Sequence, residues 1–238
     1  MRRALLAASL LIFTSLSVWA EEARLVVVEL FTSQGCYSCP PADRYAGKLR
    51  SRPDVLPLSF HVDYWDYIGW KDPFALPSNA ARQRDYAASF GLHSIYTPQM
   101  VVSGQLEGVG SREARIEKLI EKVKTDGKFF AAPKIGRDSA GMLRIDIPQA
   151  AYGGSADVYF IAYEGEKTQV ISRGENAGKT LTYYNVVRDF SRVGSWDGEA
   201  RHFDIDGAAA MPAGADGCAV IVQERTSGAI IGAARLSL

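Results

Sequence analysis

Hydrophobic and polar positions in the first part of the chain follow strand and helix patterns in turn. A short, β-branched apolar run over residues 24–31 predicts a buried strand, and apolar residues at helical spacing predict a helix over 37–51. A second strand over 54–62 and a helix over 77–90, which ends before a glycine, follow in the same way. The chain therefore begins with the order β-α-β-α.

Two further segments complete this part. Residues 97–110 have the pattern of a strand, a Gly-containing turn and a returning strand. Residues 111–124 place their apolar side chains on one face of a helix. The predicted order is therefore β-α-β-α-β-β-α, which we assign to an α/β domain over residues 24–125.

The pattern changes after residue 133. From there to residue 238 the chain consists of short alternating runs separated by Gly, Asp and Asn, without a sustained helical period. Roughly eight short strands with turn signals between them predict an all-β, sandwich-like domain over 130–238. The boundary between the two domains is expected within residues 125–133.

The first twenty residues have a different composition. They begin with Arg2 and Arg3, continue through an apolar middle, and end in a small residue at Ala20. This is the pattern of a secretory signal peptide over 1–20, cleaved after Ala20, with a retained anchor helix as the alternative. The apolar run is short for a membrane span. We therefore expect a periplasmic or secreted protein without a stable membrane anchor after cleavage.

The overall composition does not point to a particular class of partner. The chain has 238 residues, of which 47% are hydrophobic and 23% charged, and its formal net charge is zero. This length can bury a core without disulfides. A neutral chain gives no reason to expect binding to nucleic acid or to an anionic membrane surface. Nothing in the composition signals an oligomer or a cofactor.

Cys36 and Cys39 are separated by two residues, directly before two prolines. Such a pair can be a redox centre, half of a metal site or a structural staple. A loop of this size constrains the unfolded chain little, which weakens the staple interpretation in an exported protein. The third cysteine, Cys218, lies in an apolar alternating run, and we expect a buried, inert thiol there.

The metal interpretation has two forms. Structural zinc needs two further ligands, and the remaining candidates are not paired at ligand spacing (Cys218, His61, His93 and His202). Two thiolates with His61, at the end of the second predicted strand, would form a soft site for Cu(I). A copper carrier or non-catalytic binding module therefore stays as the alternative, although His61 fits a hydrogen-bonded structural role equally well. We assign no metal ligand.

Two other segments are candidates for the surroundings of the cysteines. The aromatic run DYWDYIGWKDPF, residues 63–74, could line a peptide groove next to Cys36 or form a packed lid that joins the two domains. Farther along, GENAGKTLTYYNVVRDF carries Glu175, Asn176 and Arg188 among turn residues. It is either ordinary turn chemistry before a strand or a site between the domains.

Five stretches carry a resemblance to a known family: VELFTSQGCYSCPPADR, FHVDYWD, GWKDPF, YTPQMVVSG and GENAGKTLTYYNVVR. They resemble a family of exported thioredoxin-like proteins that is catalogued as a domain of unknown function. The order of elements is similar to the smaller, glutaredoxin-type core of the thioredoxin fold. The resemblance implies a thioredoxin-like domain followed by the β domain.

The same resemblance implies roles for five residues. Cys36 would be the exposed nucleophile and Cys39 the resolving thiol. Pro98 would be a cis-proline facing the pair, and Thr97 before it would contact the partner. Glu29 would be the buried acid that accepts the proton of Cys39, although it lies seven residues before Cys36, one more than the fold leads us to expect.

The expected chemistry follows from the position of the pair. A cysteine at a helix N-terminus lies close to unpaired N–H groups, which favour the thiolate that disulfide exchange requires. Two intervening residues allow the second sulfur to reach the first and to resolve a mixed disulfide. We therefore expect an exported thiol–disulfide oxidoreductase whose partners are protein thiols and disulfides.

Overall fold

The structure, a computed structural model, describes residues 24–237, so the predicted signal peptide lies outside the described residues. The first part of the chain alternates strands and helices. Its elements are β1 (Val26–Thr32), α1 (Pro40–Arg50), β2 (Val55–His61), the 3₁₀ turn η1 (Asp66–Ile68), α2 (Pro77–Ser89), β3 (Gln99–Val102), β4 (Leu106–Val109) and α3 (Glu113–Asp126).

The second part is built mainly of strands. Its elements are β5 (Lys134–Arg137), β6 (Met142–Ile147), β7 (Ala156–Val170), β8 (Thr180–Trp196), β9 (Arg201–Asp206), the short helix α4 (Gly207–Ala210), β10 (Gly217–Glu224) and β11 (Ile230–Ser237). Two runs that the pattern separates, 156–163 and 167–172, largely merge into the single long strand β7. The intervening Glu-Gly-Glu stays extended because β8 pairs along it and Asp216 accepts a bond from the Gly165 N–H at 2.6 Å.

Eight strands form one mixed sheet with the order β11-β10-β7-β8-β2-β1-β3-β4. β1 is parallel to β2 and antiparallel to β3. The two parts of the chain meet where β2 and β8 pair in parallel at Ser59 and Val186. The Ser59 hydroxyl reinforces this junction by donating to the Tyr184 carbonyl at 2.8 Å. The sheet therefore continues across the predicted boundary near residue 130.

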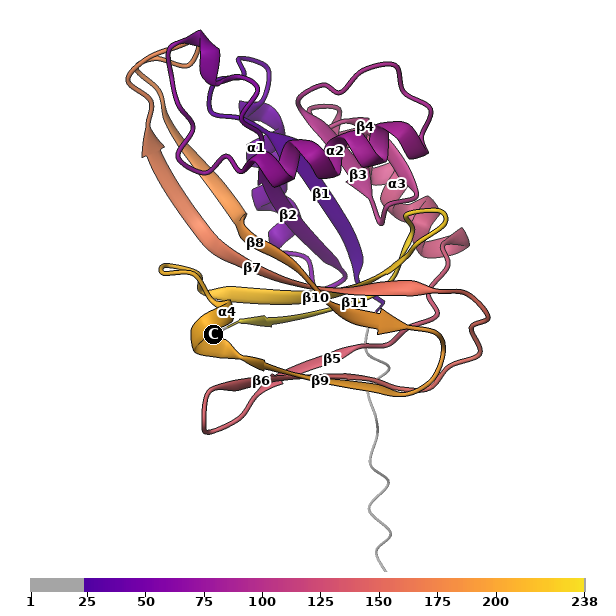
Figure 1. Cartoon of the computed structure of the whole chain (residues 1–238). Coiled ribbons are helices and arrows are strands. Elements are labelled where there is room, and N and C mark those ends of the chain that lie inside the picture. The colour runs from indigo at the N-terminus through magenta and orange to yellow at the C-terminus, as the bar shows by residue number, and fades with distance from the viewer. Residues whose placement is uncertain (1–23, 238) are drawn as a thin grey trace, which may run out of the picture.

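Helices cover both faces of the first part of the sheet (Figure 1). Val26, Val28 and Leu30 of β1 pack against α1 and α3, whereas Val27 and Phe31 lie in the cluster that contains α2. Successive side chains of a strand point to opposite faces, which explains this division. The alternation also determines the face on which each polar residue of β1 is buried.

A small antiparallel sheet with the order β5-β6-β9 forms a further layer against β7, β10 and β11. Its apolar side chains, among them Leu143 and Ile145, join a cluster with Phe160, Trp196 and Val220. The architecture is thus a mixed α/β sheet core with a small antiparallel three-stranded sheet. It differs from the predicted all-β unit in that β7, β8, β10 and β11 belong to the sheet of the first part.

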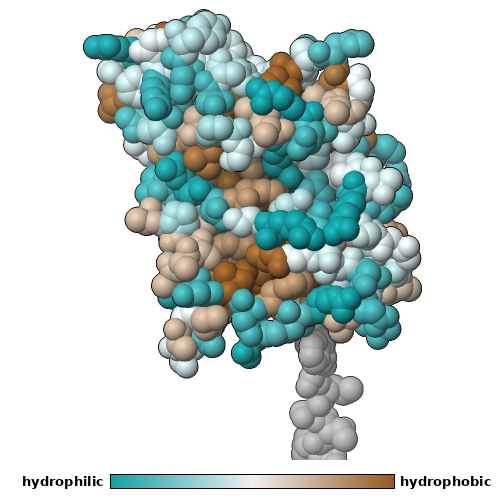
Figure 2. Space-filling view, in the orientation of Figure 1, coloured by the Kyte–Doolittle hydropathy of each residue, from teal (hydrophilic) through white to brown (hydrophobic). Residues whose placement is uncertain are grey.

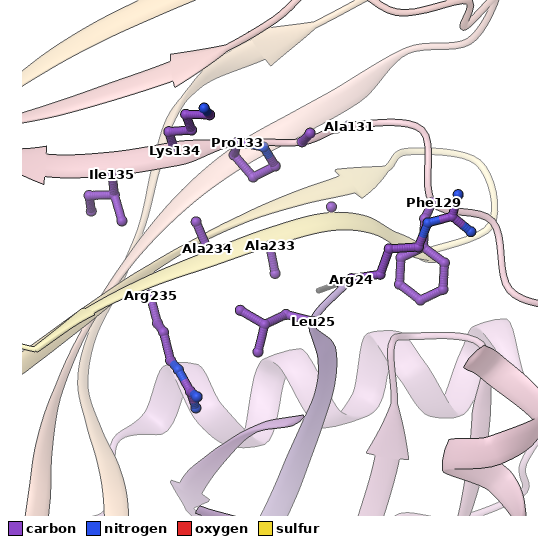
Figure 3. Close-up of a pocket in the computed structure, with 12 residues that line it drawn as sticks. Arg24, Leu25, Phe129, Ala131, Pro133, Lys134, Ile135, Ala233, Ala234 and Arg235 are labelled. Carbon is purple, nitrogen blue, oxygen red and sulfur yellow. The ribbon is translucent and has the colours of Figure 1, made fainter. Parts of the chain in front are cut away.

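The surface shown in Figure 2 is largely hydrophilic, with a few smaller hydrophobic patches. Within residues 24–237, no helix has the length and apolarity needed to cross a bilayer. A cavity of about 200 Å³ opens beside the start of β1, lined by Arg24, Leu25, Phe129 and part of β11 (Figure 3). This cavity lies at the opposite end of β1 from the cysteines, which follow the last residue of that strand.

Candidate active site

Cys36 and Cys39 form a disulfide in the loop between β1 and α1. Cys39 is the N-cap residue of α1, and the prolines that follow occupy the first positions of the helix, where a backbone N–H is dispensable. Both cysteines are buried, with Cys36 only 1% exposed. The expected exposure of Cys36 is therefore not observed in the disulfide form.

The aromatic segment after β2 explains this burial. A Cβ atom placed on Gly35 would lie 3.1 Å from both Trp65 Cβ and Ile68 Cδ1, so the segment packs directly on the cysteine loop. Trp70 Nε1 donates to Gln34 Oε1 at 2.8 Å and adds a second contact. Of the two roles considered for this segment, packing against the cysteine loop is the one that these contacts describe.

Thr97 lies beside the cysteine loop. The Thr97–Pro98 peptide bond is cis, as expected. The Thr97 carbonyl accepts a bond from the Ser38 hydroxyl at 3.5 Å, and the Thr97 hydroxyl accepts one from Trp65 Nε1 at 2.8 Å. The segment before β3 therefore contacts both the cysteine loop and the aromatic segment.

Glu29 is fully buried on the other face of the sheet. Its carboxylate pairs with Arg82 Nε at 2.6 Å and accepts a hydrogen bond from the Tyr86 hydroxyl. Arg82 and Tyr86 belong to α2, whereas the cysteines precede α1 on the opposite face. The seven-residue spacing explains this, because a shift of one residue along a strand reverses the face of the side chain. The structure therefore does not bring Glu29 to the cysteine helix.

A different carboxyl group, Asp43, lies on that helix. Its backbone N–H donates to the Cys39 carbonyl at 3.1 Å, and its Oδ1 accepts a bond from the Thr32 hydroxyl at 2.7 Å. Oδ2 is buried and has no hydrogen-bond partner among residues 24–237. Burial raises the pKa of Asp43 to about 7, although the charge of His61 and the Thr32 hydrogen bond act in the opposite direction.

The sequence pattern missed Asp43 for a physical reason. An aspartate in the first turn of a helix is normally an exposed residue that interacts with the helix dipole. Only the tertiary packing buries this one, because the first turn of α1 lies against the end of β1. The one local signal was its position four residues after Cys39, which places both residues on the same side of the helix.

His61 is held by Asp72. Nδ1 lies 2.7 Å from Asp72 Oδ2, and both side chains are fully buried. Asp72 also accepts bonds from the backbone N–H groups of Gln34 and Phe74. These bonds and the charge of His61 lower the pKa of Asp72 against the effect of burial, which alone would raise it. The pair thus connects β2 with the loop that contains the cysteines.

Asp43 Oδ2, His61 Nε2 and Tyr183 Oη are buried polar atoms without hydrogen-bond partners in the described part of the chain, as is Gln34 Nε2 of the cysteine loop. The rings of His61 and Tyr183 lie edge to face with centroids 4.8 Å apart. Burial raises the pKa of Tyr183 far above its usual value, and the charges of Asp43 and Asp72 add to this effect. Asp43 therefore belongs to a small buried polar cluster contributed by α1, β2 and β8.

The ligand set considered for copper is not assembled as such. Among the described residues, no three His, Cys, Asp or Glu side chains gather in an arrangement that could hold a metal ion. One nitrogen of His61 is engaged by Asp72, which agrees with the structural role considered for this histidine.

The turn between β7 and β8 contacts the cysteine loop from the second part of the chain. Asn176 Nδ2 donates to the carbonyls of Gln34 and Cys36 at 2.8 and 2.9 Å. Glu175 Oε2 accepts a bond from the Tyr37 N–H at 3.1 Å. Arg188, also considered from the sequence, instead donates to the Pro73 carbonyl at 3.3 Å. Glu175 and Asn176 thus lie at the cysteines, across the junction of the two parts.

Comparisons with known proteins give the family of the chain and two similar structures. A family model described as "Protein of unknown function (DUF1223)" matches residues 27–223. The crystal structure of protein AGR_C_4864 from Agrobacterium tumefaciens is similar with a TM-score of 0.81 at 35% identity, covering 92% of this chain and 96% of that chain. HBP35 of Porphyromonas gingivalis is similar in fold alone, with a TM-score of 0.65 at 15% identity over 91% of this chain and 76% of that one. No curated protein matches the chain.

Proposed function

The chain belongs to the DUF1223 family, and we propose that it acts as a thiol–disulfide oxidoreductase that exchanges disulfides with protein partners through Cys36 and Cys39. The observation that carries this proposal is the disulfide itself, in a two-residue loop at the N-terminus of α1 and beside Thr97. The strand order β2-β1-β3-β4, with α1 and α3 on one face and α2 on the other, supports a thioredoxin-like assignment for this part of the fold.

In the reducing direction, the Cys36 thiolate attacks one sulfur of the partner's disulfide. The partner's S–S bond breaks, a mixed disulfide with Cys36 forms, and the other partner sulfur leaves as a thiolate. Cys39 then loses its proton and attacks Cys36 Sγ, which releases the second partner thiolate and restores the Cys36–Cys39 disulfide. Two electrons pass from the protein to the partner, and the reverse sequence oxidises a partner dithiol.

The resolving step needs a proton acceptor inside the protein, because Cys39 is fully buried. Asp43 is suited to this role: it lies one helical turn after Cys39 and is held by Thr32 through only one of its oxygens. Its pKa of about 7 allows it to change protonation state near neutral pH. We assign this role to Asp43 in place of Glu29, whose carboxylate is engaged by Arg82.

The remaining parts of the proposal concern the partner and the compartment. Thr97 and Pro98 lie at the loop where a partner's backbone would bind, which the contact between Thr97 and Ser38 supports. An exported location, with removal of residues 1–20, would place the pair in an oxidising compartment. Because the loop closed by this disulfide is small, the bond adds little to the stability of the fold. Its reversible formation in such a compartment therefore fits a role in disulfide exchange better than a structural role.

Replacing Cys39 with serine tests the proposal. This variant should accumulate covalent adducts with partner proteins that disappear on treatment with reductant, because attack by Cys36 proceeds and resolution does not. Replacing Cys36 with serine, the matched control, should give no adducts. A Cys39→Ser protein without adducts would contradict the exchange function, and tight binding of one Cu(I) by the reduced wild-type protein would then favour the carrier alternative.

A further inference from the structure

We propose that the turn between β7 and β8, residues 173–179, is a functional part of the redox site and sets how readily the Cys36–Cys39 disulfide is reduced, through the opposite charges of Glu175 and Lys179. This inference rests on the proposed redox function and adds the element that adjusts it. The turn belongs to the second part of the chain, about 140 residues after the cysteine loop, and we call it the tuning turn.

Asn176 fixes the tuning turn on the cysteine loop. Its side chain is fully buried, and both of its amide hydrogens are used by the carbonyls of Gln34 and Cys36. Its Oδ1 accepts a bond from Lys179 Nζ at 2.8 Å. The Asn176 side chain is thus bonded to the cysteine loop on one side and to Lys179 on the other, and it fixes the position of Lys179 relative to the loop. Asn176 is therefore a positioning residue.

The long hairpin of β7 and β8 brings the tuning turn to the cysteine loop. β7 and β8 contain 15 and 17 residues, and their pairing extends to Val170 and Thr180 (Figure 1). Backbone bonds between Ile171 and the segment 178–179 close the base of the turn. A Cβ on Gly174 would lie 3.3 Å from Trp70 Cβ, so the turn also packs against the aromatic segment. These contacts give the turn a fixed position over the loop.

The two charges flank Tyr37, the residue directly after Cys36. The Glu175 carboxylate accepts the Tyr37 N–H, and Lys179 Nζ lies 4.8 Å from the centre of the Tyr37 ring. On its inner side, the loop contacts Asp72 through the Gln34 N–H and Asp43 through the Cys39 carbonyl. Asp43, the His61–Asp72 pair and Tyr183 are thus ionisable groups on the inner side of the loop, and they are separate from the turn. Within the turn, Arg173 is a further charged residue beside Glu175 and Lys179.

These charges act on the reduced state. Reduction by dithiothreitol converts the protein disulfide into the Cys36 thiolate and the Cys39 thiol, with one proton released and dithiothreitol oxidised to its cyclic disulfide. Two electrons are transferred. A nearby carboxylate disfavours the thiolate and shifts the equilibrium towards the disulfide, whereas a nearby ammonium group does the opposite. The disulfide itself carries no charge, so it does not respond in the same way.

Redox titration of three proteins at neutral pH tests this directly. In dithiothreitol buffers, Glu175→Gln should be reduced about threefold more readily than the wild type, and Lys179→Gln about threefold less readily. Each shift corresponds to about 14 mV in opposite directions, since a tenfold change in the equilibrium constant is about 30 mV. Ultraviolet titration of the thiolate should show a lower Cys36 pKa in Glu175→Gln and a higher one in Lys179→Gln. Both shifts should shrink at high salt.

The controls separate charge from a general effect of surface mutation. Glu199→Gln, between β8 and β9, and Lys118→Gln, on α3, remove the same charges at exposed positions outside the turn and should leave the equilibrium unchanged. In an Asn176→Ala background, the effects of the two tuning-turn variants should diminish, because the turn is no longer held on the loop.

The possible results distinguish this inference from the proposed function. Unchanged equilibria in Glu175→Gln and Lys179→Gln, or shifts of the same sign, would overturn the tuning role while leaving partner trapping by Cys39→Ser intact. Opposite shifts without any partner trapping would retain the tuning role and remove the exchange function. The titration reports on the pair in either case, since it does not depend on a protein partner.

Discussion

Glu29 and Arg82 form a buried ion pair, with Arg82 Nε 2.6 Å from the Glu29 carboxylate. The guanidinium also lies over the Phe190 ring and donates to Gln223, so it is enclosed by β1, α2, β8 and β10. Glu29 is fully buried and the Arg82 side chain is only 12% exposed, so each charge depends on the other for compensation. The pair is therefore a structural element of the sheet core and is separate from the cysteine chemistry.

Glu29→Gln should destabilise the protein by about 3–5 kcal/mol, because it leaves the Arg82 charge buried without its partner. The free energy of unfolding in urea, measured with the disulfide intact, reports this loss. Arg50→Gln is the matched control, since the exposed pair of Arg50 with Glu166 at 3.5 Å should contribute less than about 1 kcal/mol. A stable Glu29→Gln protein that no longer resolves mixed disulfides would return the proton-acceptor role to Glu29.

Asp43→Asn should slow resolution by about 100-fold near neutral pH, because the buried Cys39 thiol loses its proton acceptor. The measurement loads Cys36 with a chromophoric thiol as a mixed disulfide and follows its release by Cys39 in rapid mixing. Between pH 6 and 9 the wild-type rate should show a step near the pKa of Asp43, and the variant should lack it. Equal rates and equal pH profiles for the two proteins would contradict the assignment.

The same substitution should raise stability in alkaline solution. The pKa of Asp43 is raised from 3.8 to about 7 in the folded protein, so between these values the folded state binds more protons than the unfolded one. The contribution of this group to the free energy of unfolding therefore falls as pH rises, by up to about 1.4 kcal/mol per pH unit. Urea unfolding at pH 5 and pH 8 should show this fall in the wild type and a smaller one in Asp43→Asn; an identical fall in both would contradict the burial of an ionisable group here.

The Cys218 thiol should neither react with reagents in the native protein nor take part in disulfide exchange. It lies fully buried in β10, and burial raises its pKa to about 11, as the expected inert thiol requires. A maleimide reagent should label it only in denaturant, and Cys218→Ala should keep full exchange activity at a cost of about 1 kcal/mol in stability. Rapid labelling of the oxidised native protein, or loss of exchange in the variant, would show that this thiol is accessible or required.

Local patterns predicted those elements whose formation depends on nearby residues. The strand before the cysteines, the helix after them and the second strand follow from apolar spacing, and β1, α1 and β2 lie within one to three residues of the predicted bounds. The length of β7 and its place beside β10 were not predictable in this way. They depend on pairing across long separations and on the bond from Gly165 to Asp216, which periodicity does not encode.

In the candidate site, too, the residues that local sequence could identify differ from those that depend on tertiary contacts. The cysteine pair and the cis bond at Pro98 could be inferred from a motif and a resemblance. The role implied for Glu29 was wrong because a difference of one residue along a strand places the side chain on the opposite face of the sheet. Asp43 could not be recognised, because its significance arises from burial. The sequence allows two interpretations of Asn176, an ordinary turn or a site between the domains, and the contacts with residues 140 and 142 positions earlier that distinguish them require the fold.

The hydrogen bonds from Asn176 to the cysteine loop join residues that are made at different times during synthesis. Cys36 leaves the ribosome 140 residues before Asn176, so the nascent chain exposes both thiols well before the turn that will cover their loop exists. Chains are made from the N-terminus, and contacts of high sequence separation form late. While the residues between Cys36 and Asn176 are being made, the second part of the chain does not yet cover the two thiols, and other thiols and disulfides can react with them. We therefore expect a newly made molecule to be most vulnerable to wrong disulfide pairing before residues 173–179 have been made.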